Sequence, residues 1–145
     1  MATINPYLNF PGNAEEAFNF YQSVFGGDFM MLQRYSDVPG DVVVKKLSPD
    51  EGQKIMYIAL PIGKENVLMA TDALESTGRP LTTGNNFSIS INAGSKEEAE
   101  RIFNGLSSGG AITMPLADAF WGAYFGMFTD RFGIQWMVNF DYQSA

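Results

Sequence analysis

The chain has 145 residues and a net charge of −7 at pH 7, and it contains neither Cys nor His. This length suggests one domain, or two small modules that share a core. The lack of cysteine excludes disulfide scaffolds, Cys-based zinc sites and Cys nucleophiles. The lack of histidine removes the commonest metal ligand and the usual general base at neutral pH. The acidic balance argues against nucleic acid as a partner, because nucleic-acid binding requires clustered Lys and Arg.

Hydropathy gives no sign of a membrane segment. The longest uncharged apolar runs are too short to cross a bilayer, and the first residues do not join a basic region to an apolar stretch. We therefore expect a soluble cytoplasmic protein with no membrane partner. Hydrophobic residues make up 46% of the chain, which is enough for a core of ordinary size.

The first part of the chain predicts a strand, a helix and a second strand. Asn13 follows a Pro-Gly turn and is a good N-cap for a helix. Apolar residues at helical spacing then predict an amphipathic helix, which Gly26-Gly27 ends. The flanking segments alternate between apolar and polar residues, as strands do. The three expected elements are Ile4–Phe10, Ala14–Phe25 and Phe29–Tyr35.

The middle of the chain is less regular. Turn signals and mixed charge in Ser36–Gln53 predict an exposed loop, with Val42–Val44 as the place for a short extra strand. A hairpin is expected next, over Ile55–Ile62 and Val67–Thr71. The segment from Ser76 to Asn85 is rich in turn residues and is the best candidate for a linker.

The second half repeats the order of the first half. Glu15-Glu16-Ala17 recurs as Glu97-Glu98-Ala99, an offset of 97 − 15 = 82, while Leu8 and Ile89 match at 89 − 8 = 81. Ser95 and Glu98 form a capping box before a second amphipathic helix, and a strand is expected over Ile112–Leu116. The same strand, cap, helix and Gly order occurring twice indicates an internal repeat of βαβββ modules.

Phe120–Asn139 predicts a closing hairpin. Trp121, Ala123, Phe125 and Met127 alternate with Gly122, Tyr124, Gly126 and Phe128, as expected for a strand. A turn follows, in which Asp130 favours turn entry and Gly133 takes a positive φ. A second strand, Ile134–Phe140, places Trp136, Val138 and Phe140 on one face.

These motifs resemble a known family. FWG, TDRFG and QWM in the closing hairpin, with GNAEEA and FYQSVFGG near the start, resemble the PhnB-like branch of the glyoxalase/bleomycin-resistance/dioxygenase superfamily, also called vicinal oxygen chelate proteins. The resemblance implies an α+β fold of two βαβββ modules, with cupped mixed sheets and helices outside. The modules would be residues 1–75 and 86–145, joined by the linker 76–85 in one compact domain.

The resemblance also implies where a metal would sit. In metal-binding members each module gives ligands from its first and last strands, and here those positions fall near Asn5, Met69, Asn86 and Met137. Amides and thioethers are poor ligands for the divalent metals that such sites hold. We therefore expect no metal. A Gly-rich turn between strand and helix, the usual form of a nucleotide-like cofactor site, is also missing, so we expect no cofactor.

A polar inner row remains as the candidate site. If the apolar residues of the first strand of each module pack against helices, alternate residues face into the cup, where an aromatic cavity with a few polar groups would hold a small molecule. A solvated sheet face is the alternative. The candidate ligand-binding residues are Asn5, Tyr7, Asn9, Tyr57, Met69, Asn86, Ser88, Trp121, Tyr124 and Met137.

Three functions remain open at this point. The first is a metal-free small-molecule binding protein with its ligand in the cup of the paired sheets. The second is an enzyme, lyase, isomerase or dioxygenase-like, which uses carboxylate or tyrosine chemistry or an unrecognised metal site, with Asp118 and Tyr124 as catalytic candidates. The third is a dimeric interaction module. A homodimer is expected in each case, because the exposed aromatic hairpin and the small size favour a partner.

Overall fold

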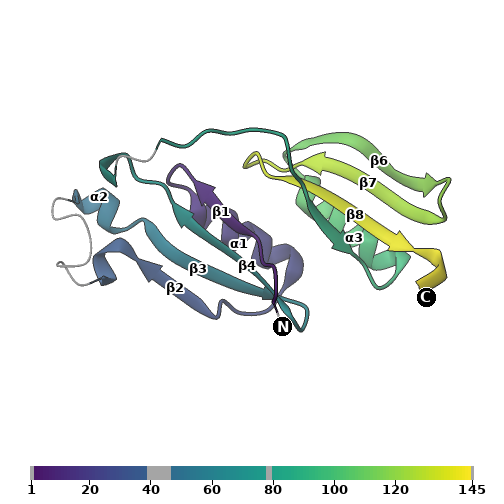
Figure 1. Ribbon diagram of the computed structural model, residues 1–145, viewed down its shortest axis with the longest axis horizontal. Helices are drawn as coiled ribbons and strands as arrows, with labels where there is room; N and C mark the ends of the chain where they lie inside the picture. The colour runs from purple at the N-terminus through teal and green to yellow at the C-terminus, as the bar shows by residue number, and fades with distance from the viewer. Residues whose placement is uncertain (1, 39–46, 78–79, 145) are drawn as a thin grey trace. The chain divides into compact units, whose positions relative to one another are not determined.

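The computed structural model describes residues 2–38, 47–77 and 80–144, and in this part of the chain the strands form two four-stranded sheets (Figure 1). The chain divides into two compact units, Met1–Thr82 and Thr83–Ala145. Each sheet has a helix on one face, so the α+β class and the two-module organisation expected from the sequence are confirmed.

The described residues of the first unit form one long helix and four strands. The sheet has the order β1-β4-β3-β2, in which β1 pairs with β4 in parallel and the other neighbours are antiparallel. Short helical turns occur at Tyr35–Asp37, Pro49–Gly52 and Glu75–Thr77. The main elements are β1 (Tyr7–Phe10), α1 (Ala14–Phe25), β2 (Met31–Arg34), β3 (Ile55–Ile62) and β4 (Asn66–Asp72).

The second unit repeats this topology. Its sheet has the order β5-β8-β7-β6, and β5 pairs with β8 in parallel just as β1 pairs with β4. The predicted internal repeat is therefore confirmed at the level of strand order. The elements are β5 (Ile89–Asn92), α3 (Lys96–Ser107), β6 (Ala111–Ala119), β7 (Ala123–Thr129) and β8 (Gln135–Asp141), followed by a short turn at Tyr142–Ser144.

Each helix buries one apolar stripe against its own sheet. In the first unit, Phe18 and Tyr21 of α1 are fully buried and pack edge to face, and the strand residues on that side are Leu8, Phe10, Ile58, Leu60, Leu68 and Ala70. In the second unit, Phe103 of α3 packs edge to face on Phe128 of β7 at 5.1 Å between ring centroids. We call the opposite side of each sheet the helix-free face. In Figure 1 each helix lies behind its own sheet.

Several details of the predicted elements need correction. Asn13 precedes α1, but its side chain makes no cap hydrogen bond; Asp72 at the end of β4 accepts from the N–H of Ala14 at 2.9 Å instead. Trp121 is not in a strand, because β6 continues to Ala119 and the chain turns at Phe120–Gly122, where Gly122 has φ +89°. The predicted strand at Val42–Val44 lies outside the described residues.

Other local predictions are confirmed. The helix α1 has the predicted bounds. Ser95 caps α3 as predicted, by accepting from the N–H of Glu98 at 3.1 Å. The predicted capping box is only half formed, because the Glu98 carboxylate accepts from the N–H of Gly94 at 2.9 Å and not from that of Ser95. Gly133 has φ +88°, as the turn between β7 and β8 requires. In the part of the chain that the structure describes, no helix is long and apolar enough to cross a membrane.

Candidate functional site

The helix-free face of the first sheet joins two tyrosines and a methionine. Tyr7 of β1 lies beside Met69 of β4 in the strand register. Its ring stacks on that of Tyr57 of β3, with centroids 6.4 Å apart and planes 24° from parallel. Tyr7 is 49% exposed, and Asn9 continues the same face of β1. The structure therefore brings together four predicted site residues, Tyr7, Asn9, Tyr57 and Met69.

The helix-free face of the second sheet carries a row of thioethers. Met137 of β8 is the register partner of Met127 in β7 and of Ser90 in β5. Met127 in turn pairs with Met114 of β6. Paired residues on one face of a sheet have Cβ atoms about 4.5–5.5 Å apart, so the three methionine side chains are neighbours. Of the predicted site residues, Met137 lies on this face.

Three further predicted site residues, Asn5, Asn86 and Ser88, lie before the first strand of their unit. The amide oxygen of Asn5 accepts from the N–H of Val67 at 2.9 Å, which fixes this side chain to β4. Asn86 and Ser88 lie before β5, where Asn86 is exposed and Ser88 is half-buried. The adjacent carbonyl of Phe87 accepts from the side chain of Gln135 at 2.9 Å.

Trp121 lies in an aromatic cluster at the β6–β7 turn. Its ring is 5.0 Å from that of Phe120 and 5.4 Å from that of Phe125, both edge to face. Phe125 belongs to the helix-free face because it pairs with Asn139, which alternates with the buried Val138 and Phe140. Trp121 is 55% exposed and Phe120 is 97% exposed, so the cluster extends from this face into the turn.

Tyr124 does not line the same face, which corrects the sequence prediction. It pairs with Phe140, a residue buried on the helix side. Its hydroxyl donates to Glu100 of α3 at 3.1 Å, and the ammonium group of Lys96 lies 4.8 Å from its ring centroid. Partial burial and the hydrogen bond to Glu100 raise the pKa of Tyr124 above its ordinary value. Successive residues of a strand point to opposite faces of the sheet, so Tyr124 cannot share a face with Phe125 and Met127.

Asp118, the other catalytic candidate, is also on the helix side. It lies within β6 and pairs with Tyr124 in the register. Its carboxylate accepts a short hydrogen bond from the hydroxyl of Tyr142, and this bond raises the pKa of Tyr142 to about 12. A phenol with a raised pKa keeps its proton at neutral pH. The hydroxyl of Tyr142 therefore cannot act as a general base at neutral pH.

The positions where the resemblance places metal ligands do not suit a divalent ion. The Asn5 oxygen is already bound to a backbone N–H, and Met69 and Met137 offer thioethers, which hard and borderline divalent ions bind poorly. Within the described residues, no group of three or more His, Cys, Asp or Glu side chains could hold a metal ion. The donor set does not fit the metal chemistry of the metal-binding relatives.

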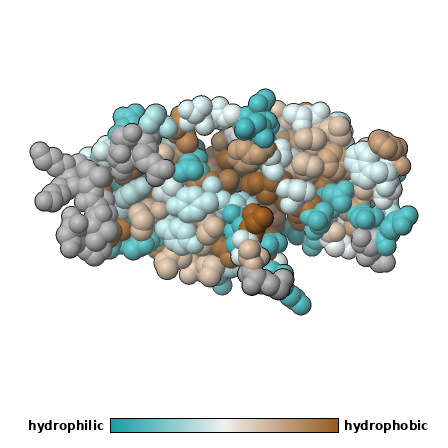
Figure 2. Space-filling view, in the orientation of Figure 1, coloured by the Kyte–Doolittle hydropathy of each residue, from teal (hydrophilic) through white to brown (hydrophobic). Residues whose placement is uncertain are grey.

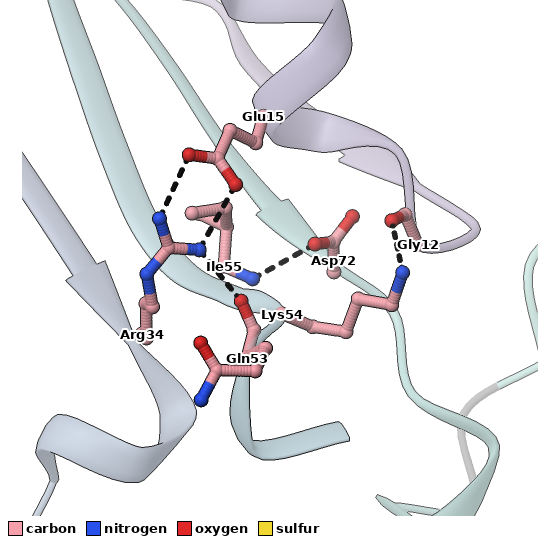
Figure 3. A pocket seen from close by; sticks show the side chains of 7 residues that line it. All are labelled: Gly12, Glu15, Arg34, Gln53, Lys54, Ile55 and Asp72. Carbon is pink, nitrogen blue, oxygen red and sulfur yellow. Dashed lines mark hydrogen bonds and ion pairs between the residues drawn. The ribbon is translucent and has the colours of Figure 1, made fainter. Parts of the chain in front are cut away.

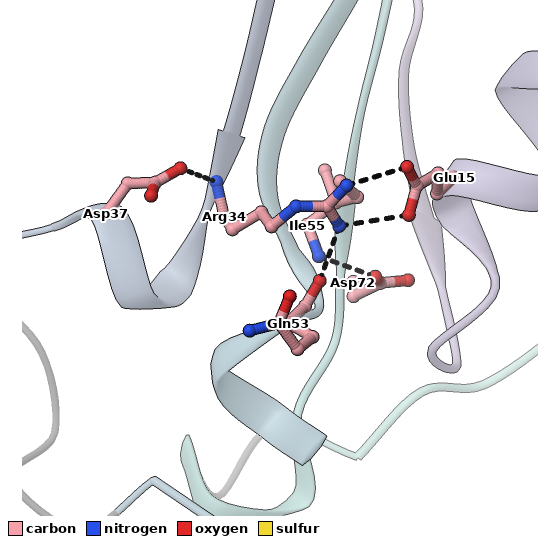
Figure 4. Close-up of polar contacts among 6 residues, drawn as sticks. All are labelled: Glu15, Arg34, Asp37, Gln53, Ile55 and Asp72. Carbon is pink, nitrogen blue, oxygen red and sulfur yellow. Dashed lines mark hydrogen bonds and ion pairs between the residues drawn. The ribbon is translucent and has the colours of Figure 1, made fainter. Parts of the chain in front are cut away.

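A polar pocket that sequence reasoning missed lies beside the start of α1 (Figure 3). It has a volume of about 280 Å³. Arg34 of β2 makes a two-pronged ion pair with Glu15 of α1, at 2.7 and 2.9 Å, and also donates to the carbonyl of Gln53 at 2.7 Å (Figure 4). The pocket is lined by Gly12, Glu15, Arg34, Gln53, Lys54, Ile55 and Asp72.

The polar groups of this pocket bind one another. Asp72 is buried and accepts from the N–H groups of Ala14 at 2.9 Å and Ile55 at 2.8 Å. Lys54 donates to the carbonyl of Gly12 at 2.9 Å. The hydrogen bond from Arg34, opposed by some desolvation, lowers the pKa of Glu15. These bonds fasten α1 to the ends of three strands, so the cluster has a structural role. No local sequence signal pairs Glu15 with a residue 19 positions away.

Comparisons with known proteins agree with this architecture. The family model of the Glyoxalase/Bleomycin resistance protein/Dioxygenase superfamily matches residues 3–138. Protein YjdN of Escherichia coli strain K12 is 28% identical over 140 residues, which cover 94% of this chain and 93% of YjdN.

Solved structures give the same result. Protein PA1353 from Pseudomonas aeruginosa is 42% identical with a TM-score of 0.83, over 97% of this chain and 98% of that one. A PhnB protein from Bacillus cereus shares the fold, with 24% identity and a TM-score of 0.74 over 96% and 99% of the two chains. The chain belongs to the Glyoxalase/Bleomycin resistance protein/Dioxygenase superfamily, in which it resembles the PhnB-like branch.

Proposed function

We propose that this protein binds a small organic molecule on the helix-free face of its first sheet and needs no divalent metal to do so. The observation that carries the proposal is the stacked pair Tyr7–Tyr57 beside Met69, on the face of the sheet opposite α1. Aromatic and thioether side chains with a few polar groups are the usual lining of a small-molecule site.

Exposure of these groups supports the same conclusion. Burying a large apolar side chain is favourable by about 1.5–3 kcal/mol. Tyrosine and methionine side chains that stay half exposed to solvent forgo part of this free energy, so a face that bound nothing would be better formed by polar residues. Tyr7 and Met31 are each about half exposed, at 49% and 48%. In Figure 2, pale and brown residues are interspersed with teal ones across the view, so this surface is not uniformly polar.

The family supports a small-molecule ligand in a general way. The superfamily description names glyoxalases, dioxygenases and bleomycin resistance proteins together. Glyoxalase and dioxygenase chemistry would need a group that activates the substrate, and Asp118 and Tyr124 lie on the helix side, away from the proposed surface. Binding without turnover is therefore the function that the arrangement supports best.

A thermal-shift screen against small organic molecules, run in the presence of a chelator, tests the proposal. A ligand that binds the folded state raises the melting temperature by mass action. The shift should be lost in Tyr7→Ala and kept in Ile112→Ala. Ile112 is a suitable control because it is similarly exposed, at 53%, but pairs with Phe128 on the helix side of the second sheet. A shift that appears only with added divalent metal would overturn the proposal.

We also propose that the protein is a homodimer in solution. The support is the exposed aromatic cluster at the β6–β7 turn, in which Phe120 is almost fully exposed, because exposed apolar groups of this size favour association. Light scattering at micromolar concentration tests this proposal, and a monomer mass would overturn it.

A further inference from the structure

The two helix-free faces share a side-chain pattern that their strand order makes comparable. In the first sheet, one row across the strands is Met31 of β2, Ala59 of β3, Met69 of β4 and Tyr7 of β1. In the second sheet, the equivalent row is Met114 of β6, Met127 of β7, Met137 of β8 and Ser90 of β5. In each unit, the second and the fourth strand along the chain both contribute a methionine to the row: β2 and β4 in the first unit, β6 and β8 in the second.

Polar residues on these faces are amides and hydroxyls. Beside the first row, Gln33 pairs with Tyr57, and Asn9 pairs with Thr71. Beside the second row, Asn139 pairs with Asn92 in the register, and their side chains form a hydrogen bond of 3.4 Å. Each of these groups can donate or accept a hydrogen bond without carrying a charge.

Charged side chains lie on the other side of the sheets. Among the described strand residues, the register puts Arg34, Asp72 and Asp118 on the helix side. Among these described strand residues, Asp141 at the end of β8 is the one charged group on a helix-free face, and it already accepts from the N–H of Gln143 at 2.9 Å. Three of the four charged residues in the described strands therefore lie on the helix side, away from the methionine rows.

We infer that the ligand of the helix-free face of the first sheet is a neutral molecule, with a flat, polarisable apolar body and groups of the amide or carbonyl type. This inference rests on the proposed function and names the ligand class. A charged ligand that leaves water for a face without an opposite charge loses hydration that nothing there replaces. Thioethers suit an aromatic body, because methionine is flexible and its sulfur makes favourable contacts with rings.

Three probes that share one aromatic body test the inference: 2-naphthamide, 2-naphthoate and 2-naphthylmethylammonium. Calorimetric titration at pH 7 should give a Kd for the amide at least about tenfold lower than for either ion. An ion that binds as tightly as the amide overturns the inference and leaves the proposed function standing. Failure of all three probes to bind at millimolar concentration also overturns it, and the thermal-shift screen then decides on the proposed function separately.

A matched pair of variants shows whether the charge-free face sets this preference. Met31→Lys adds a cation at the end of the first row, at a side chain that is 48% exposed and so leaves room for lysine. We expect it to improve binding of naphthoate relative to naphthamide by about tenfold. Leu32→Lys puts the same charge on the helix side of β2, where Leu32 is 37% exposed and pairs with Ile58, and should leave the ratio unchanged. Equal changes in the two variants would show that overall charge, not the face, controls binding, and would overturn the inference.

Discussion

Asp130 joins the turn between β7 and β8 to the core by accepting a hydrogen bond from the indole N–H of Trp136 at 2.8 Å. Its other oxygen accepts from the N–H groups of Phe132 at 2.8 Å and Ile134 at 3.0 Å. Asp130 is 3% exposed and Trp136 is 1% exposed. One carboxylate therefore satisfies three donors, and it ties the local turn to the largest buried side chain of the second unit.

Asp130→Asn should destabilise the protein by about 1–3 kcal/mol, because the amide must turn its N–H₂ group toward one of these donors and leave it unsatisfied. The turn alone would suggest a mild effect, since Asn serves nearly as well as Asp there. Denaturant unfolding measures the change. Asp141→Asn is the matched control: that residue is exposed and accepts one backbone N–H. Equal effects at both positions would refute the role given to the Trp136 bond.

The Asp130–Trp136 bond shows what the sequence can and cannot predict. Turn chemistry alone identified Asp130 and the positive φ of Gly133, because both depend on a few adjacent residues. The indole partner depends on how the turn folds back on β8. Asn13 is the opposite case. Its residue type and position predicted an N-cap, but the carboxylate of Asp72 accepts from the N–H of Ala14, 58 positions away in the sequence.

Gly126 in β7 is a packing position that admits no side chain. A Cβ atom there would lie 2.6 Å from a ring carbon of Phe103 and 2.9 Å from the Cα of Leu116. Gly126→Ala should therefore destabilise the second unit by about 1–3 kcal/mol through overpacking. Gly84→Ala is the control, since the nearest atom to its Cβ is 3.9 Å away. Thermal unfolding compares them, and similar melting temperatures would contradict the packing described here.

The Glu15–Arg34 pair should give a pH-dependent contribution to stability. The pKa of Glu15 is lowered in the folded state, so the contribution is present above the unfolded value, about 4.3, and is lost as pH falls through the folded value. Glu15→Gln should lower the melting temperature at pH 7 and have little effect at pH 3. Both side chains are partly exposed, at 43% and 27%, so the loss should be no more than about 1 kcal/mol.

Glu16→Gln is the matched control for this experiment. Glu16 occupies the same first turn of α1 and is exposed, so it shares any interaction with the helix dipole. If the two variants lose the same stability at pH 7, the helix terminus and not Arg34 explains the effect.

Only part of the candidate site could be predicted from the sequence, because several of its neighbours are set by the pairing of strands that are distant in the sequence. Period-two alternation places Tyr7, Asn9 and Met69 on one side of their strands, and the register confirms that Tyr7 and Met69 are neighbours. Trp121 was misplaced because the apolar alternation continues through the turn at Gly122, where no strand exists. The methionine rows depend on which residues of different strands come into register, and such pairings are not visible in one strand.

The hydrogen bond from Tyr142 to Asp118 should be visible in a spectrophotometric titration of the tyrosines. This bond raises the pKa of Tyr142 to about 12, so its contribution to stability is complete below the unfolded value near 10 and is lost as pH rises toward 12. The difference in phenolate absorbance between wild type and Tyr142→Phe should have its midpoint near the raised value. Asp118→Asn removes the negative charge and should move that midpoint back toward the ordinary value. Tyr7→Phe, which removes a phenol elsewhere, should leave the high-pH step in place. A Tyr142 midpoint that is unchanged by Asp118→Asn would show that Asp118 is not the cause.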